Sequence, residues 1–141
     1  MLSIFDVDVI SAGGGETLKF PHRSIIHRRG EEGDCAYIIK RGHVELRHKG
    51  RAVETIAPGE IFGEACLLTR SPRLAAAIAQ GDVELVCIDR SLFNTLLRDD
   101  EDFSRAIIMR LARRLRATNE LFEKTVGEET AAIVEPFRAS A

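Results

Sequence analysis

Apolar and polar residues alternate in short runs between residues 17 and 89, and Gly or Pro ends most of these runs. A period of two residues is typical of strands with one buried face, and short runs between turn residues favour antiparallel pairing. The predicted strands include residues 17–20, 24–28, 35–40, 43–48, 52–56, 74–79 and 83–88. About eight strands of this length predict a mainly β chain folded as a double-sheet jelly roll.

The hydrophobic period changes to that of a helix after Asp89. Asp89 or Ser91 can cap a first helix. Its apolar stripe is Leu92, Phe93, Leu96 and Leu97. A second, longer helix is predicted from about residue 100 to 124, with a stripe of Phe103, Ile107, Leu111, Leu115, Thr118 and Phe122. Acidic residues at its start and arginines further along follow the order that the helix dipole favours.

Residues 1–16 fit two patterns. Asp6 can cap a short helix that ends at the three glycines 13–15. The alternation over residues 5–9 also fits a strand.

The chemistry is concentrated in residues 62–77, which read FGEACLLTRSPRLAAA. Gly63 allows backbone to approach a ligand, and a short helix after it offers free amides to an anion. Glu64 can accept from a hydroxyl, and Arg73 carries the planar fork that suits phosphate oxygens. The small residues 75–77 leave room beside the backbone. Together these features predict a cradle for a small anion that also carries hydroxyls.

This run resembles the phosphate-binding cassette of cyclic-nucleotide-binding domains, the module of the catabolite activator protein and of the regulatory subunit of cAMP-dependent protein kinase. Residues 30–34 (GEEGD) and Tyr37-x-Ile39-x-x-Gly42-x-Val44 resemble the early strands of the same family. The glycines of these early strands are expected to serve turns. Because related domains begin with helical segments, the resemblance favours a helix in residues 1–16.

The resemblance implies a role for each matching position. Arg73 binds the cyclic phosphate with backbone amides near residues 74–76, and Glu64 accepts from the ribose 2′-hydroxyl with help from Gly63 and Ala65. Leu46 and Val53 flank the nucleotide, although both could be simple core residues. The full set of expected ligand-binding residues is Phe62, Gly63, Glu64, Ala65, Cys66, Leu67, Arg73, Leu74, Ala75, Ala76, Leu46, Val53, Thr118 and Asn119.

Two positions of the cassette, at which this sequence differs from some family members, bear on the choice of ligand. Family members that select cGMP often carry Thr in the arginine segment, and the corresponding position here is Ala76, which favours cAMP. The activator protein has a hydroxyl residue where Leu74 stands, so one phosphate contact is expected to be missing. The kinase branch also has an apolar residue there.

The long helix carries a second resemblance, over residues 112–120. It looks like the dimer helix of the activator protein, in which a Thr-Ser pair reaches the adenine and the serine comes from the partner subunit. Thr118 takes the threonine position and Asn119 replaces the serine. The resemblance therefore implies a homodimer through residues 101–124 and movement of the C-terminal helices on binding. Thr118 could equally bond a carbonyl of its own helix.

Two other classes of function stay open. Some domains of this fold serve as ligand-free dimerisation or docking units. A DNA-binding regulator would use the arginines of the long helix, but these more often form a solvated face. A helix-turn-helix module would need several tens of residues beyond residue 124, so the sequence is expected to be a stand-alone binding domain that signals to an unidentified protein partner.

Composition narrows the alternatives. The 141 residues carry 20 basic and 22 acidic side chains, a balance that does not indicate a nucleic-acid binder. The cysteines Cys35, Cys66 and Cys87 lack disulfide or metal spacing, which favours reduced thiols in the cytoplasm. Neither a catalytic set nor a metal-ligand pattern is visible among the four histidines, His22, His27, His43 and His48. We therefore expect no enzyme activity, no metal, no cofactor and no membrane span.

These observations predict one domain over residues 1–125, with the β-roll at about 17–89 and the helices at about 90–124. Residues 126–141 contain Gly127, acids and Pro136 and are predicted to form a flexible tail.

Overall fold

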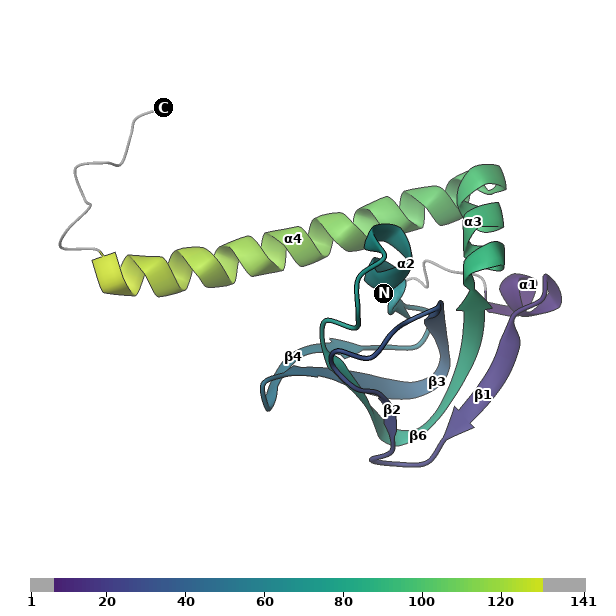
Figure 1. Ribbon diagram of the computed structural model, residues 1–141, viewed down its shortest axis with the longest axis horizontal. Coiled ribbons are helices and arrows are strands. Elements are labelled where there is room, and N and C mark those ends of the chain that lie inside the picture. Colours follow the sequence, from purple (N-terminus) through teal and green to yellow (C-terminus); the bar gives the residue numbers. More distant parts are fainter. Residues whose placement is uncertain (1–6, 131–141) are drawn as a thin grey trace. The chain divides into compact units, whose positions relative to one another are not determined.

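The computed structural model describes residues 7–130. Figure 1 shows the elements along the chain. They are α1 (Val7–Ala12), β1 (Glu16–Phe20), β2 (Ile25–His27), β3 (Cys35–His48), β4 (Arg51–Ile56), β5 (Ile61–Phe62), α2 (Glu64–Thr69), β6 (Ala76–Asp89), α3 (Arg90–Asp99) and α4 (Glu101–Thr130). The chain divides after Phe103 into two compact units, of which the first holds the sheet with α1 to α3 and the second holds α4 from Ser104 on.

The strands form an antiparallel jelly roll, as the alternation predicted. The order β1-β6-β3-β4 forms the main path, while β2 pairs with β6 and β5 pairs with β3. Within residues 7–130 there are six strands, because two pairs of predicted strands are continuous: residues 35–48 form β3 and residues 76–89 form β6. The short strand β5 was not predicted, and two residues are too few to show an alternation.

Gly42 explains how β3 stays continuous while it bends. The register of β3 against β6 shifts twice here, between Ile39 and Arg41 and again across Gly42, between Arg41 and His43. Gly42 has a φ of 83°, and a Cβ there would lie 2.5 Å from the carbonyl oxygen of Asp82. Only glycine combines this backbone conformation with so close an approach of β6.

The two faces of the long strands β3 and β6 are buried against different parts of the protein. The inner face forms the core of the roll, whose buried members are Tyr37, Ile39, Val44, Leu46, Ile56, Phe62, Ala77, Ala79, Val83 and Leu85. The opposite face carries Ala36, Ile38, Val86 and Ile88, which are also buried. Helices α1 and α3 contact β3 and β6, and both faces of these strands therefore read as apolar.

Asp89 caps α3, as the sequence predicted. Its side chain accepts a hydrogen bond from the backbone amide of Leu92 at 2.8 Å. Phe93 of α3 packs edge-on against Phe103 with 5.7 Å between ring centroids. These contacts hold α3 at the end of the roll where β6 finishes and β3 begins.

The other helices match the predicted types but not all the boundaries. Helix α1 confirms the helical interpretation of the N-terminal segment, whereas its predicted cap, Asp6, lies outside the described residues. Helix α4 continues past the predicted end at residue 124 to Thr130, because Gly127 lowers helix stability without breaking the hydrogen-bond ladder. Residues 131–141 of the predicted tail lie outside the described residues. Within residues 7–130, every helix is too short or too polar to cross a bilayer.

Candidate functional site

The predicted cassette folds as β5, the short helix α2 and the loop that leads to β6 (Figure 1). Gly63 precedes the helix with a φ of 82°, a left-handed conformation that favours glycine. Glu64 is the first residue of α2, and its side chain is fully buried. The helix ends at Arg70, whose φ of 54° turns the chain toward Arg73. The cassette thus brings Glu64 and Arg73 into the interior of the roll.

The backbone of Arg73 is fixed by the loop between β2 and β3. Its amide donates to the carbonyl of Glu31 at 2.8 Å, and its own carbonyl accepts from the amide of Gly30 at 2.8 Å. These two backbone hydrogen bonds join the cassette to the GEEGD segment, residues 30–34. The start of the Arg73 side chain is therefore held in a defined position.

The Arg73 guanidinium points into the protein and is 4% exposed. Nη1 donates to the Gly63 carbonyl at 3.1 Å, and Nη2 donates to the Cys35 carbonyl at 2.8 Å. The nitrogens also contact two sulfurs, Cys66 Sγ at 3.7 Å from Nη1 and Cys35 Sγ at 3.6 Å from Nη2. Nε is buried and has no hydrogen-bond partner within residues 7–130. One donor on the fork thus stays available to an acceptor from outside the described chain.

Two glycines make room for this side chain. A Cβ on Gly33 would lie 2.5 Å from Arg73 Nε, and a Cβ on Gly63 would lie 2.6 Å from Nη1. The expectation that the early-strand glycines only serve turns is wrong for Gly33, which needs no left-handed conformation. It is glycine because the guanidinium lies against its α-carbon.

Three aromatic rings lie beside the guanidinium. The Arg73 Cζ atom lies 5.5 Å from the centre of the Tyr37 ring, a cation–π distance. Tyr37 stacks on Phe62 with 5.2 Å between centroids, and His27 lies 6.4 Å from Tyr37 and 6.0 Å from Phe62. Burial, and then the positive charge of Arg73, lower the pKa of His27 to about 4. His27 is therefore a neutral member of this ring cluster at physiological pH.

Two thiols near Arg73 titrate as a pair. A hydrogen bond from the Cys87 thiol, together with Tyr37 and Arg73, outweighs burial and lowers the pKa of Cys35 to about 6. The same hydrogen bond and burial raise the pKa of Cys87 well above its usual range. Burial, and then the neighbouring Cys35, also raise the pKa of Tyr37. The opposite directions of the two pKa shifts favour the thiolate on Cys35 over the thiolate on Cys87.

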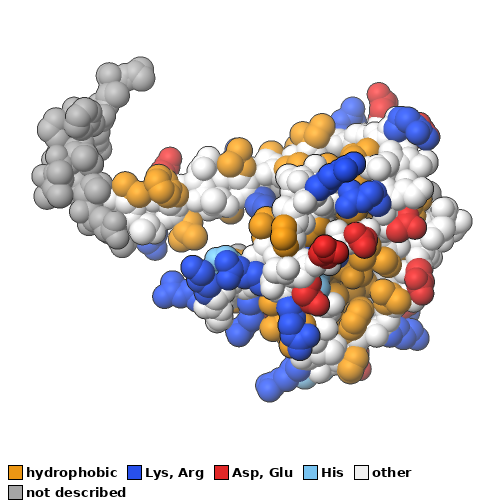
Figure 2. Space-filling model, viewed as in Figure 1, with side chains coloured by type: hydrophobic (Ala, Val, Ile, Leu, Met, Phe, Trp, Pro, Cys, Tyr) orange, Lys and Arg blue, Asp and Glu red, His pale blue; other side chains and the backbone are white. Residues whose placement is uncertain are grey.

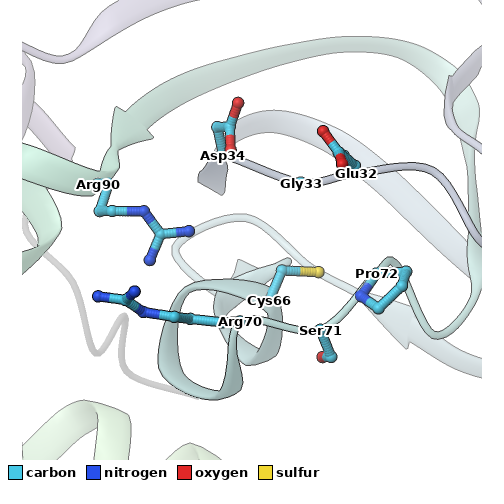
Figure 3. Close-up of a pocket in the computed structure, with 8 residues that line it drawn as sticks. All are labelled: Glu32, Gly33, Asp34, Cys66, Arg70, Ser71, Pro72 and Arg90. Atoms are coloured by element: carbon cyan, nitrogen blue, oxygen red, sulfur yellow. The ribbon is translucent and has the colours of Figure 1, made fainter.

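A pocket of about 370 Å³ lies beside the cassette. Figure 3 shows the guanidinium groups of Arg70 and Arg90 approaching each other on one side, with Asp34 and Glu32 on the loop opposite. Glu64 and Arg73 do not line this pocket, but Gly33 and Cys66 belong both to its wall and to the surroundings of Arg73. The pocket and the Arg73 chamber are therefore neighbours that share two residues.

The other predicted ligand residues fall into three groups. Phe62, Cys66 and Leu67 are buried, like Glu64, and Ala65, Ala75 and Ala76 are half-buried. Leu46 is a core residue, whereas Val53 and Leu74 are 57% and 60% exposed. Thr118 and Asn119 are exposed on α4, in a different compact unit from the cassette, so their contact with a ligand stays a prediction.

Sequence reasoning missed four residues that surround Arg73: Gly33, His27, Cys35 and Tyr37. Tyr37 and Gly33 were noted only as part of a resembling strand and turn, and His27 only as a rejected metal ligand. The signal in the sequence was the place of Gly33 and Tyr37 in the segments that resemble the early strands of the family, and His27 and Cys35 lie outside those segments.

The sequence profile of the cyclic nucleotide-binding domain matches residues 17–100, which include the roll, the cassette and α3. The chain belongs to the cyclic nucleotide-binding domain family. This is a family of regulatory binding domains and not a catalytic one.

Curated relatives come from both branches named by the resemblance. The chain is 42% identical over 72 residues to a cAMP-dependent protein kinase regulatory subunit of Eremothecium gossypii, covering 51% of this chain and 16% of that protein. It is 31% identical over 109 residues to a CRP-like cAMP-activated global transcriptional regulator of Mycobacterium tuberculosis, covering 74% and 49%. The chain therefore spans half or less of the length of these relatives.

A solved structure shares the fold. The catabolite activator protein of Thermus thermophilus superposes with a TM-score of 0.77 and 30% identity, covering 87% of this chain and 60% of that chain.

Proposed function

We infer that this chain binds cAMP and acts as a regulatory sensor. The observation that carries the proposal is the chamber around Arg73: a buried guanidinium with one unused donor, at the end of a cassette that also buries Glu64. Charged groups are rarely buried unless a partner or a function requires it. Relatives in this family are named for dependence on cAMP or activation by it, which supports the same ligand.

In the proposed complex Arg73 holds the cyclic phosphate. Nε donates to one phosphate oxygen. The terminal nitrogens Nη1 and Nη2 give up their bonds to the Gly63 and Cys35 carbonyls and donate to a second phosphate oxygen instead. Charge-assisted bonds to phosphate are stronger than bonds to neutral carbonyls, so the exchange favours the ligand. Glu64 accepts from the ribose 2′-hydroxyl, and the Gly63 and Ala65 backbone completes the sugar contacts.

The preference for cAMP over cGMP rests on Ala76. This residue is half-buried at the start of β6, opposite Arg47 of β3. It carries no hydroxyl that could hydrogen-bond a guanine. Leu74 is exposed and also lacks a hydroxyl, so the phosphate is held by fewer side-chain contacts than in the activator protein.

Signalling is proposed to run through the C-terminal helices. Helix α3 follows directly from β6 and is anchored by Phe93, and α4 continues the chain after a break at Asp100. A ligand shifts such helices only if it binds one arrangement better than another. Thr118 and Asn119 on α4 are the proposed adenine contacts that would supply this difference.

Helix α4 is also the proposed dimer interface. It exposes several large apolar side chains in the second compact unit (Figure 2). Leu111, Leu115 and Phe122 are spaced so that they share one helix face, and Leu115 and Phe122 are 61% and 65% exposed. Exposed apolar stripes of this kind mark surfaces that associate with a partner.

A second candidate function is a docking module that has lost its ligand. The observation in its favour is that the two terminal nitrogens of Arg73 already contact two carbonyls and two sulfurs of its own chain. Both candidates share the roll and the α4 surface, and they differ only in whether a nucleotide enters the chamber.

Calorimetric titration with cAMP, cGMP and 5′-AMP tests the proposal. Saturable cAMP binding that is tighter than cGMP binding is expected, and Arg73→Ala should weaken it by about 2–5 kcal/mol. Arg70→Ala is the matched control, because Arg70 lies on the same loop but is exposed and lines the neighbouring pocket. No heat and no thermal shift with any nucleotide would favour the docking module. Equal cAMP and cGMP affinity would keep the sensor and discard the argument from Ala76.

A further inference from the structure

All three cysteines of the chain converge on Arg73, although they come from separate elements. Cys35 is the first residue of β3, Cys66 lies in α2, and Cys87 lies near the end of β6. Cys35 and Cys66 contact the guanidinium directly through sulfur, at 3.6 Å and 3.7 Å. Cys87 reaches it through its hydrogen bond to Cys35. This arrangement is not needed for phosphate binding, which the fork and the backbone can supply.

The strand register places Cys35 and Cys87 on one face of the sheet. Cys35 lies opposite Asp89, and Tyr37 lies opposite Cys87, so the two cysteines are diagonal neighbours on β3 and β6. Diagonal positions are about 7–8 Å apart between α-carbons, slightly more than a disulfide spans. A bridge would thus require a small shift of the strands. Both residues lie within two residues of a strand end, where such a shift is least opposed.

Reactivity and access also separate the three thiols. The Cys87 thiol and the Arg73 guanidinium, 3.6 Å from Cys35 Sγ, lower the pKa of Cys35 and favour its thiolate, the form that peroxides oxidise. Cys35 and Cys87 are half-buried, whereas Cys66 is only 2% exposed. The charged and titratable groups that surround the pair are Tyr37, Arg73, Glu16 and Asp89.

We propose that Cys35 is a peroxide-sensitive thiol at the phosphate site, that Cys87 is its resolving partner, and that their oxidation state tunes how strongly Arg73 binds a nucleotide. The thiol pair stands on its own geometry, whereas its effect on the nucleotide rests on the proposed function above.

The chemistry needs only hydrogen peroxide as oxidant. The Cys35 thiolate attacks one peroxide oxygen, the O–O bond breaks, and the leaving hydroxide takes up a proton to give water and a sulfenic acid on Cys35. The Cys87 sulfur then attacks the Cys35 sulfur, and the sulfenic hydroxyl leaves with the Cys87 proton as a second water. The two thiols together lose two electrons to one peroxide. A dithiol reductant reverses the bridge by exchange, and the strand shift that the bridge requires makes this reduction easier.

The thiolate and a bound phosphate compete for one guanidinium. A cyclic phosphate that binds Arg73 places a second negative charge near Cys35. The two negative charges repel, so the bound nucleotide and the Cys35 thiolate disfavour each other. The pKa of Cys35 is about 6, so protonating its thiolate at pH 7 costs about a factor of ten in an equilibrium constant. The thiolate can be neutralised at that cost, and it therefore weakens cAMP binding by no more than about tenfold. Oxidation removes the thiolate charge, so the oxidised protein should bind cAMP up to about tenfold more tightly than the reduced protein. By reciprocity, cAMP should slow the oxidation.

The test treats the reduced full chain with hydrogen peroxide in the presence of dimedone, which traps sulfenic acids, and locates the adducts by peptide mass spectrometry. Wild type should give a Cys35–Cys87 bridge. Cys87→Ser should instead accumulate the dimedone adduct on Cys35, and Cys35→Ser should give neither product. Cys66→Ser keeps the pair and should still form the Cys35–Cys87 bridge, which shows that Cys66 is not one of the two bonded sulfurs. Arg73→Gln should slow the reaction, because the charge that favours the thiolate is removed.

Each outcome decides a part of the proposal. First reaction at Cys66, a bridge that includes Cys66, or no adduct on Cys35 of Cys87→Ser would overturn the thiol pair. Binding of cAMP with the same affinity before and after oxidation would overturn the coupling. If the Cys35 chemistry is found but no nucleotide binds in either state, the proposed function and the coupling fail together, and the thiol pair stands.

Discussion

Gly33 and Arg73 fit together so closely that a single methyl group between them would displace the guanidinium. A Cβ at Gly33 would lie 2.5 Å from Nε and 2.6 Å from Cζ of Arg73. The two residues are also tied through the backbone, since residues 30 and 31 of the same loop pair with Arg73. The loop between β2 and β3 therefore decides where the charge of the site lies.

Gly33→Ala tests this relationship. The added methyl group should push the Arg73 side chain out of its chamber and weaken cAMP binding by about 1–3 kcal/mol, with a smaller loss of stability. Titration calorimetry and thermal unfolding measure the two effects. Glu32→Ala, at the exposed position next to Gly33, is the control and should bind like wild type. Unchanged affinity in Gly33→Ala would mean that the observed position of Arg73 is not the one that binds phosphate.

Glu64 is predicted to recognise the ribose 2′-hydroxyl. Wild type should therefore bind 2′-deoxy-cAMP more weakly than cAMP by about 1.5–3 kcal/mol, the range for a hydrogen bond to a charged group. Glu64→Gln, which keeps the size of this fully buried side chain, should bind the two nucleotides with more similar affinity. A difference between the nucleotides that is as large in the variant as in wild type would assign the hydroxyl to another partner.

His27 should make the folded protein sensitive to mild acid. The pKa of His27 in the folded state, about 4, is lower than the usual 6.5, so between these values the unfolded chain binds a proton that the folded chain does not. Its contribution to stability is thus complete above pH 6.5, falls as the pH drops toward 4, and amounts to about 2–3 kcal/mol.

His27→Phe should keep the packing against Tyr37 and Phe62 and remove this titration. Denaturant unfolding at pH 7 and at pH 4.5 measures the difference, with His43→Gln as an exposed control. Equal loss of stability on acidification in His27→Phe and in wild type would assign the acid sensitivity to the carboxylates instead.

The exposed stripe on α4 predicts association of two chains. Leu115→Glu should shift a dimer toward monomer, because each large apolar side chain buried at an interface contributes about 2–3 kcal/mol. Sedimentation equilibrium measures the change, and Glu120→Lys, elsewhere on the same helix, should leave the dimer intact. A wild-type chain that is monomeric at high concentration would remove this surface as a dimer interface.

The sequence by itself determined the parts of this protein that depend on local patterns. Alternation over residues 17–89 predicted the jelly roll, the change of period at Asp89 predicted the helices, and the residue types of the run 62–77, together with its resemblance to a known family, indicated the cassette. A strand, a cap or a turn is set by neighbouring residues, so a linear pattern contains enough information. The continuity of β3 through Gly42 was missed, because a glycine that bends a strand cannot be distinguished in the sequence from a glycine that ends one.

Only the tertiary structure decided what surrounds Arg73. The register of β3 against β6 brings Cys35 and Cys87 together, and the folding of α2 adds Cys66, although nothing in the spacing of the three cysteines suggests a cluster. Gly33 resembles a turn residue in the sequence and is a packing residue in the fold. Such contacts join segments that are distant along the chain, and their geometry is fixed by how the strands pair and not by any local preference.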